Sequence, residues 1–447
     1  MKSISLRNAT IINEGRIFEG NVYVKDGKIW NVDPIGKDRI ADWQLDLKGA
    51  YLIPGAIDDQ VHFREPGLTH KGELMTESRA AVAGGVTSFM EMPNTVPGAT
   101  SRALLEQKYS RAAEVSAANY SFFMGTTNHN LEELLQTDYS QVCGVKIFMG
   151  SSTGNMLVDD EAALQAIFSQ VPALMALHCE VDPMIKANQQ AYLDSYGADG
   201  LNAQMHPLIR SREACYASSS KAVEMAKKYG TRIHVLHIST AEELALFSNE
   251  LPLEQKRITA EACIHHLWFS DEDYAEKGNF IKWNPAVKSA SDRDAILQAV
   301  NDNRIDVIAT DHAPHTLEEK QQAYLQAPSG GPLVQHSVQA MFELAAQGKI
   351  SFEHVVQKMS HDVARLFRIQ NRGFIREGYQ ADMVVVEKQL YLVTKQNLLY
   401  KCGWSPFEGQ HFQHRIATTL VNGHPVWHEG QLDTQFRGDR LTFNVNF

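Results

Sequence analysis

The chain has 447 residues, a length that one large domain of about 250 residues and a smaller companion would account for. Hydrophobic residues make up 44% and charged residues 21% of it, which excludes disordered, coiled-coil and fibrous classes. The formal net charge of -11 argues against a nucleic-acid partner and against binding to an anionic membrane.

The beginning of the chain predicts short β-strands separated by tight turns. The expected strands cover 4–12, 21–24 and 28–32, with turns at Glu14-Gly15 and Asp26-Gly27. The far end has the same character, with strands at 381–386 and 416–422 and a turn at Gly423. Two β-rich ends around a different middle predict one small β-sandwich domain, built from residues 1–51 and 380–447.

Between these ends, apolar β-rich runs alternate with helical stretches, a pattern typical of a parallel sheet with crossover helices. The expected strands cover 56–61, 86–92, 120–124, 145–149, 174–178, 233–238, 258–263 and 306–310. The expected helices cover 73–83, 102–117, 159–170, 212–229 and 292–301. Eight strands is the number in a TIM-type barrel. Residues 52–379 are therefore predicted to form an α/β domain, a (β/α)8 barrel.

Cysteine usage bears on the compartment and on metal binding. The five cysteines are Cys143, Cys179, Cys215, Cys263 and Cys402. Their number is odd and none forms a CxxC pair, so neither a disulfide framework nor a thiolate zinc site is indicated. The N-terminus lacks an apolar signal-peptide core, and no apolar run is long enough to cross a bilayer. We therefore expect a cytoplasmic protein with no membrane partner.

Polar residues occur where the predicted strands end, the face on which barrel enzymes build their active sites. They are His62, Asn94, Lys146, His178, His237 and Asp311. Imidazoles and carboxylates that meet at one rim can hold a hydrolytic metal and leave a position for water. Taken singly, each has a plainer explanation: a lone histidine is more often structural, and Asp311 could cap a turn. Lys146 is harder to explain, because its amine would enter a packed interior at a large desolvation cost unless neutralised, paired or modified.

Five segments, in this order along the chain, resemble the signature of dihydroorotases in the amidohydrolase superfamily. They are IDDQVHFREPG at 57–67, MPNT at 92–95, HVLHIST at 234–240, EACIHHL at 261–267 and ATDHAPH at 309–315. The resemblance runs from about Leu52 to Leu366, and the two β-rich ends are similar to the companion domain of that superfamily. An ordered set of this kind is more specific than any single motif.

The resemblance implies a metal site and a reaction. The implied ligands of one or two zinc ions are His62, His178, His237, Asp311 and Lys146, the last carboxylated to a bridging carbamate. Asp311 would also act as the general base and acid. The implied reaction is the reversible conversion of L-dihydroorotate into N-carbamoyl-L-aspartate in pyrimidine biosynthesis, carried out by a homo-oligomer, a dimer or tetramer.

The resemblance also implies how a small-molecule substrate is bound. Arg64, Asn94 and His315 would bind its carboxylate, and Asn284 would bind its ring. A guanidinium suits bidentate capture of a carboxylate. The plainer alternative is that Arg64 forms a structural salt bridge with Glu65 or Glu73. The turn Ser329-Gly330-Gly331-Pro332 matches the family loosely and could offer backbone contacts to the ring. Allantoinases and hydantoinases share the barrel and metal site, but Arg64 favours a substrate that bears a carboxylate.

One position departs from the family signature. Gln60 stands where a histidine ligand is expected, and a neutral amide is a much weaker zinc donor. Asp59 would point away from Gln60 on a regular strand, so it is a poor substitute unless the backbone bulges. Three possibilities follow: two metals with Gln60 as a weak partner, one metal, or a catalytically inactive scaffold. Retention of the other ligands favours an active enzyme.

The adjacent histidines His265 and His266 are predicted to lie on a strand. Neighbours on a strand point to opposite faces, so at most one could face the site. We assign both of them structural or supporting roles.

Overall fold

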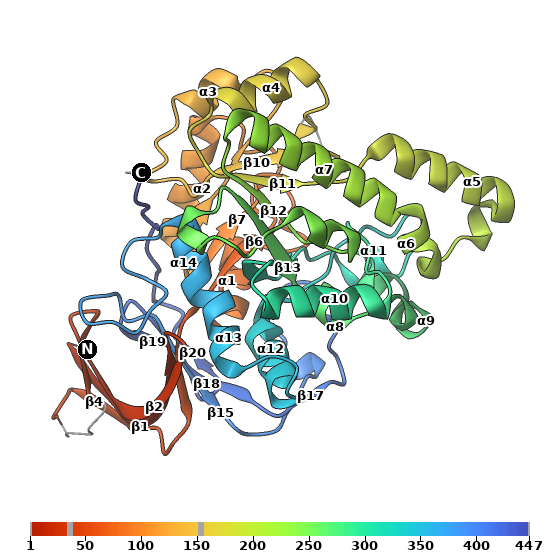
Figure 1. Ribbon diagram of the computed structural model, residues 1–447. Helices are drawn as coiled ribbons and strands as arrows, with labels where there is room; N and C mark the ends of the chain where they lie inside the picture. The colour runs from red at the N-terminus through yellow and green to blue at the C-terminus, as the bar shows by residue number, and fades with distance from the viewer. Residues whose placement is uncertain (1, 34–38, 151–155, 446–447) are drawn as a thin grey trace.

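The computed structural model describes residues 2–33, 39–150 and 156–445. Parallel strands lie at the centre of an α/β region, and a separate β-sheet lies near the N-terminus (Figure 1). None of the described helices is long and apolar enough to cross a membrane.

The sheet near the N-terminus combines strands from both ends of the chain. Its strands are β1 (Ser3–Asn13), β2 (Arg16–Lys25), β3 (Lys28–Asp33), β4 (Trp43–Asp46), β5 (Tyr51–Pro54), β15 (Met383–Glu387), β18 (Arg415–Val421), β19 (His424–His428) and β20 (Gln431–Leu432). They form one nine-stranded sheet in the order β20-β19-β18-β15-β5-β1-β2-β3, with β4 beside β1. The two ends of the chain meet where β5 pairs antiparallel with β15.

The central strands form two parallel sheets. Three strands, β6 (Ala56–Val61), β7 (Val86–Glu91) and β8 (Asn119–Phe122), make the first. The second runs from β9 (Met124–Gly125) through β10 (Val145–Phe148), β11 (Met175–His178), β12 (Ile233–Val235) and β13 (Ile258–Cys263) to β14 (Val307–Ala309). Each expected strand is present, and the third is divided into β8 and β9. The two sheets meet beyond β6 and β14, where the backbone N–H of His62 donates to the carbonyl of His312 at 2.7 Å.

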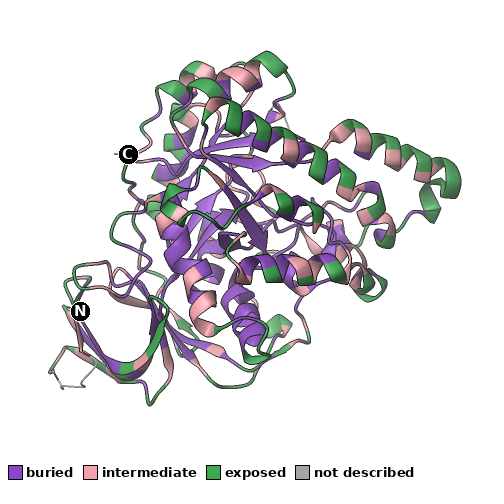
Figure 2. Cartoon of the chain, in the orientation of Figure 1, coloured by how far each residue is buried: buried purple, intermediate pink, exposed green. Residues whose placement is uncertain are grey.

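The five predicted helices are confirmed as α1 (Leu74–Ala83), α2 (Arg102–Val115), α4 (Glu161–Gln170), α7 (Arg212–Tyr229) and α10 (Ala290–Asn301). Further helices are α3 (Leu131–Leu135), α5 (Asp182–Gly200), α6 (His206–Ile209), α8 (Ile264–Trp268), α9 (Tyr274–Lys277), α11 (Leu317–Lys320), α12 (Ser337–Ala346), α13 (Phe352–Val356) and α14 (Asp362–Phe367). Most of α5 is exposed and extends away from the α/β region (Figures 1 and 2).

The strand prediction for His265 and His266 is wrong, because both residues lie in α8. Strand β13 ends at Cys263 and the chain turns directly into this short helix. His265 stacks on Trp283 with ring centroids 4.5 Å apart, and His266 Nε2 lies 3.2 Å from the carbonyl of Pro285. Neither histidine lines the cavity described below.

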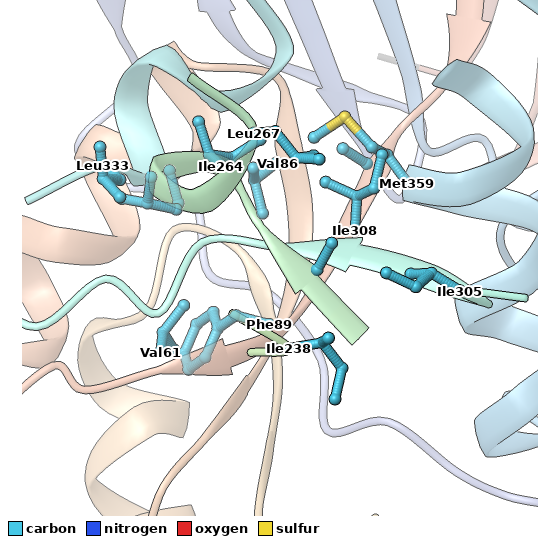
Figure 3. Close-up of a cluster of buried hydrophobic side chains, with 14 of the residues drawn as sticks. Val61, Val86, Phe89, Ile238, Ile264, Leu267, Ile305, Ile308, Leu333 and Met359 are labelled. Atoms are coloured by element: carbon cyan, nitrogen blue, oxygen red, sulfur yellow. The ribbon is translucent and has the colours of Figure 1, made fainter. Parts of the chain in front are cut away.

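Apolar side chains fill the space between the strands and the helices (Figure 3). Val61 of β6 and Phe89 of β7 are fully buried beside each other. Ile308 of β14 belongs to the same cluster, as does Leu267 of α8. Burial of such side chains contributes roughly 1.5–3 kcal/mol each. This packing holds the carboxyl ends of the strands, where the polar residues lie, in fixed positions.

Candidate active site

A cavity of about 240 Å³ lies at the carboxyl ends of the parallel strands. The structure brings every predicted site residue to its wall: His62, Arg64, Asn94, Lys146, His178, His237, Asn284, Asp311 and His315. Gln60, Ser329 and Gly330 also line it. Residues from distant parts of the sequence therefore face one small volume.

His178 and His237 form the first pair of potential metal ligands. His178 Nδ1 lies 2.9 Å from His237 Nε2, and the two rings are nearly perpendicular, with an interplanar angle of 80°. On its other side, His178 Nε2 lies 3.1 Å from Glu180 Oε2, a carboxylate that also binds Arg210. A carboxylate of this kind fixes the orientation of a ligating imidazole. Burial lowers the pKa of His237 well below its usual value, which favours the neutral form that binds metals.

His62 and Asp311 form the second pair, and Gln60 joins it. His62 Nδ1 lies 2.7 Å from Asn94 Oδ1, which leaves His62 Nε2 facing Asp311 Oδ1 at 3.2 Å. Gln60 donates from Nε2 to the same Asp311 oxygen at 3.1 Å. The departure from the family signature thus places a hydrogen bond, rather than a second imidazole, beside this pair.

The backbone is unusual at three residues of the cavity. Arg64, His237 and Asp311 have φ values of 71°, 40° and 47°. This left-handed conformation is rare for residues other than glycine and costs on the order of 1–3 kcal/mol, and it occurs often at functional sites. At His237 it coincides with the end of β12 at Val235, before the predicted end of that strand. The sharp turns after the strands direct these side chains into the cavity.

Lys146 lies on β10 and is 1% exposed. Burial lowers the pKa of its amine to about 8, and Nζ lies 4.6 Å from the centroid of the Phe148 ring. A neutral amine is the form that reacts with carbon dioxide. The position therefore suits the carboxylation that the resemblance implies.

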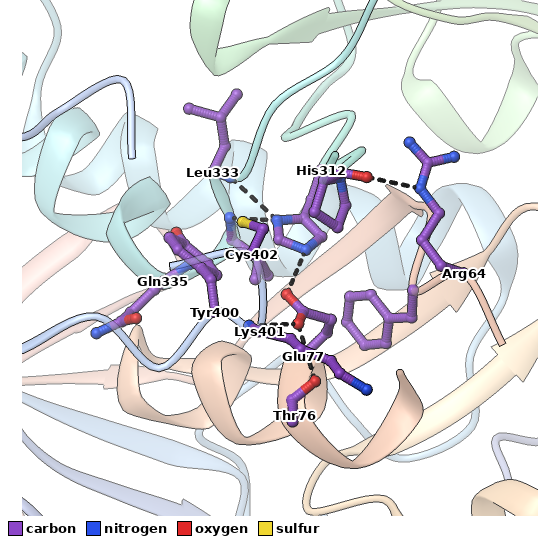
Figure 4. Close-up of polar contacts among 12 residues, drawn as sticks. Arg64, Thr76, Glu77, His312, Leu333, Gln335, Tyr400, Lys401 and Cys402 are labelled. Carbon is purple, nitrogen blue, oxygen red and sulfur yellow. Dashed lines mark hydrogen bonds and ion pairs between the residues drawn. The ribbon is translucent and has the colours of Figure 1, made fainter. Parts of the chain in front are cut away.

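Arg64 does not form the salt bridge that was the plainer alternative. Glu65 pairs with Arg111 at 2.8 Å and Glu73 with Lys401 at 3.1 Å. Arg64 instead donates from Nε to the carbonyl of Pro314 at 3.0 Å (Figure 4). Burial lowers its pKa to about 10, so the guanidinium stays charged at neutral pH.

The loop that carries Asp311 and His315 is held in place through His312. His312 Nε2 lies 2.9 Å from Glu77 Oε2 of α1, and its Nδ1 accepts a hydrogen bond from the backbone N–H of Leu333 at 3.0 Å (Figure 4). Both His312 and Glu77 are fully buried. This arrangement orients the loop after β14 toward the cavity.

Asn284 and the glycine turn offer neutral polar groups to the cavity. Asn284 Oδ1 is buried and has no hydrogen-bond partner within the described ranges. Gly330 has a φ of 125°, and a Cβ there would lie 2.5 Å from the carbonyl oxygen of Ala313. Lys320 donates from Nζ to the carbonyls of Pro328 and Gly330. The glycine turn is thus fixed at the edge of the cavity.

Several supporting residues were not predicted. Glu180 follows His178 by two positions, and this spacing is a weak signal that could have been noticed.

Asp59 does not line the cavity. The pairing register of β6 with β7 shifts between Asp58 and Val61, and Asp59 lies close to His234 and Glu261. All three residues lie in the family-like segments, but the sequence does not show that their side chains meet.

Comparison with known proteins places the chain among cyclic amide hydrolases. Residues 49–243 match the dihydro-orotase-like family model, and residues 194–426 match that of the amidohydrolase family. A dihydroorotase from Halobacterium salinarum is 31% identical over 430 residues, which cover 96% of this chain and 97% of that protein. An allantoinase from Bacillus velezensis is 30% identical over 438 residues, which cover 96% of this chain and 94% of that protein.

Solved structures show a similar fold. The L-hydantoinase (dihydropyrimidinase) from Arthrobacter aurescens superimposes with a TM-score of 0.92 at 23% identity, over 99% of this chain and 100% of that one. At this level of identity the likeness concerns the fold.

Proposed function

The chain belongs to the amidohydrolase family, and on that premise we propose that it is a dihydroorotase, which interconverts L-dihydroorotate and N-carbamoyl-L-aspartate. One observation carries this choice of substrate. The wall of the cavity holds a buried guanidinium, that of Arg64, together with a set of imidazoles, a lysine and an aspartate. A cyclic amide that bears a carboxylate can bind the guanidinium through that carboxylate and present its amide to the imidazoles, the lysine and the aspartate.

Arg64, Asn94 and His315 bind the carboxylate of the substrate in this proposal. Arg64 Nη2 lies 3.1 Å from His315 Nε2, so both groups can approach the same anion. Because His62 uses Asn94 Oδ1, the amide nitrogen of Asn94 is left to donate. Charge-assisted hydrogen bonds from a guanidinium are among the strongest that a carboxylate can accept.

Asn284 and the glycine turn bind the ring. Asn284 Oδ1 is an acceptor without a partner among the described residues, and it suits a ring N–H. The backbone of Gly330 lies at the same wall, where a side chain would collide with Ala313. These groups fix the ring so that its amide faces the histidines.

The residues fit a zinc centre. The His178–His237 and His62–Asp311 pairs each bring two donor atoms to about the separation of neighbouring ligands around one cation. A carbamate on Lys146 would add one oxygen to each pair. When bound, zinc supplies a Lewis acid that activates water near neutral pH and polarises the amide carbonyl.

Asp311 moves the proton. Its Oδ1 is already held by Gln60, so Oδ2 takes the proton of the attacking water and returns it to the ring nitrogen that leaves. In the direction of cyclisation the same oxygen removes a proton from the ureido nitrogen. His312 and Glu77 hold the loop that positions this carboxylate.

The finer description of the fold is part of the same proposal. We infer that the two parallel sheets together make a (β/α)8 barrel over residues 52–379. Residues 1–51 and 380–447 then form the small β-sandwich domain. Carboxylation of Lys146, cytoplasmic localisation and assembly into a homodimer or homotetramer remain predictions.

Turnover of three substrates by the purified, metal-loaded protein tests the proposal. We expect kcat/KM for L-dihydroorotate to exceed greatly the values for allantoin and unsubstituted hydantoin, which offer Arg64 no carboxylate. The variant Arg64→Lys keeps the charge but loses the planar fork, and should cost about 1–3 kcal/mol in kcat/KM for dihydroorotate. Equal rates on all three substrates, or an unchanged Lys variant, would refute the substrate assignment.

Allantoin hydrolysis is the second candidate, because an allantoinase is among the relatives that match along the whole chain. The two activities differ in the group that Arg64 binds. A preference for allantoin that is insensitive to Arg64→Lys would favour this candidate. Absence of turnover with all three substrates, in protein that retains metal, would favour the inactive scaffold.

A further inference from the structure

A second group of potential metal ligands lies outside the cavity. Asp59 of β6, His234 of β12 and Glu261 of β13 are each completely buried. One donor atom from each lies within 4.8 Å of the others, and no other group of three His, Cys, Asp or Glu side chains in the described ranges is so arranged. None of the three lines the cavity.

The donor atoms face one another without hydrogen bonds. His234 Nε2 lies 3.3 Å from Asp59 Oδ2 and 3.8 Å from Glu261 Oε2. These atoms, together with Asp59 Oδ1, are buried and have no hydrogen-bond partner in the part of the chain that the structure describes. Buried polar atoms are almost always satisfied. One of these atoms from each of the three side chains lies within 4.8 Å of the other two, which indicates an occupant.

The remaining atoms of the same side chains are already engaged. Thr259 donates its hydroxyl to the carbonyl of Ile233, so its oxygen accepts the Nδ1–H of His234 at 2.9 Å. In neutral His234 this leaves the lone pair of Nε2 facing the carboxylates. Glu261 Oε1 accepts from the backbone N–H of His237 at 2.9 Å, which leaves Oε2 directed at the group.

Charge balance points to a divalent cation. With His234 neutral, the two carboxylates leave two negative charges in a sealed interior, which are very costly unless they are compensated. Although burial opposes it, contact with Asp59 and Glu261 raises the pKa of His234 to about 9, so a proton on His234 would compensate one of these charges in the absence of a cation. We propose that Asp59, His234 and Glu261 bind a zinc ion in a structural site separate from the catalytic cavity. Nitrogen and oxygen donors of this kind suit zinc. Both oxygens of Asp59 are available, so the three side chains can supply four donors and leave no position for water.

Such an ion would connect the two parallel sheets through buried side chains of both. Asp59 belongs to the three-stranded sheet, whereas His234 and Glu261 belong to the six-stranded sheet. The backbone contacts between these sheets that are described above lie at the carboxyl end of β6 and beyond that of β14. Because the unfolded chain lacks the assembled site, the ion stabilises the folded protein.

Anomalous diffraction from crystals of the full chain, recorded on both sides of the zinc edge, tests the proposal directly. We expect a zinc peak about 2.0–2.2 Å from His234 Nε2, Glu261 Oε2 and Asp59. Absence of that peak, in crystals that show zinc in the cavity, would overturn the proposal. The group would then be held by protons, with His234 as an imidazolium between the carboxylates.

Metal analysis of variants gives a second, independent readout. Asp59→Asn should lose one zinc per chain relative to the unaltered protein and should unfold at a lower temperature. Asp58→Asn is the matched control, because the neighbouring Asp58 is equally buried but its oxygens accept hydrogen bonds from Thr310 and from the backbone of Gln60. We expect this control to keep its zinc. Full zinc content in Asp59→Asn would reject the site, and if that variant does not fold, the diffraction experiment decides.

Discussion

The two pairs of potential metal ligands in the cavity, His178–His237 and His62–Asp311, differ in what surrounds them. In the His178–His237 pair, Glu180 contacts His178 on the side away from His237. His178 Nδ1 and His237 Nε2 remain directed at each other. In the His62–Asp311 pair, Gln60 donates a hydrogen bond to the carboxylate of Asp311. We therefore expect this substitution to weaken metal binding at the second pair more than at the first.

Removal of Lys146 should affect both pairs and have the broadest effect, because it should lower the rate and the metal content together. In Lys146→Ala the proposed bridging oxygens are lost, so we expect kcat to fall by more than about 100-fold and the metal content to fall with it. Kinetics and metal analysis of the same sample measure both. Added propionate, which can supply two carboxylate oxygens in the vacated space, should restore part of the activity. An unmodified Lys146 by mass spectrometry in fully active, metal-loaded protein would contradict the bridging role.

The variant Asp311→Asn changes the His62–Asp311 pair and leaves the His178–His237 pair unaltered. The amide keeps the shape of the side chain but cannot accept the proton, so kcat should fall by about 10²–10⁴-fold. The metal at His178 and His237 should be retained, and the unfolding temperature should change little. A substantially active Asn variant would show that another group moves the proton.

The strands and the principal helices could be predicted because apolar β-rich runs alternate with stretches of helical periodicity along the chain. The predicted limits of 56–61 and 258–263 match β6 and β13, and those of 212–229 match α7. The apolar pattern does not predict a helix or the end of a strand correctly where exposure or a local turn determines it. In α5 only Ile185 is buried, so the helix has almost no apolar face to recognise. At β12 the left-handed turn of His237 ends the strand early.

The site could be predicted only in part, for a related reason. Ordered motifs identify the residues that face the cavity, because each motif lies at the end of one strand. They do not show which neighbours orient them. The contact of Glu180 with His178 depends on side-chain direction, and the approach of Asp59 to His234 depends on a register shift in β6. The second of these contacts joins strands that are far apart in the sequence.

Replacement of Gln60 by histidine should have the smallest effect on rate and the clearest effect on metal content. In the unaltered protein the amide of Gln60 binds Asp311 Oδ1 and offers zinc at most a weak oxygen donor. We therefore expect the metal at His178 and His237 to be fully occupied, and the position at His62 and Asp311 to be weaker.

In Gln60→His an imidazole is placed beside His62 and frees Asp311, so the metal content per chain should rise at limiting zinc, while that at His178 and His237 stays constant. Refined occupancies from crystals of both proteins, grown at the same zinc concentration, measure the difference. Asn at the same position is the matched control, because a shorter amide removes the hydrogen bond to Asp311 without adding a good ligand. Equal occupancy of the two positions in the unaltered protein would show that Gln60 does not weaken the second pair, and the asymmetry between the pairs would then have no consequence for metal binding.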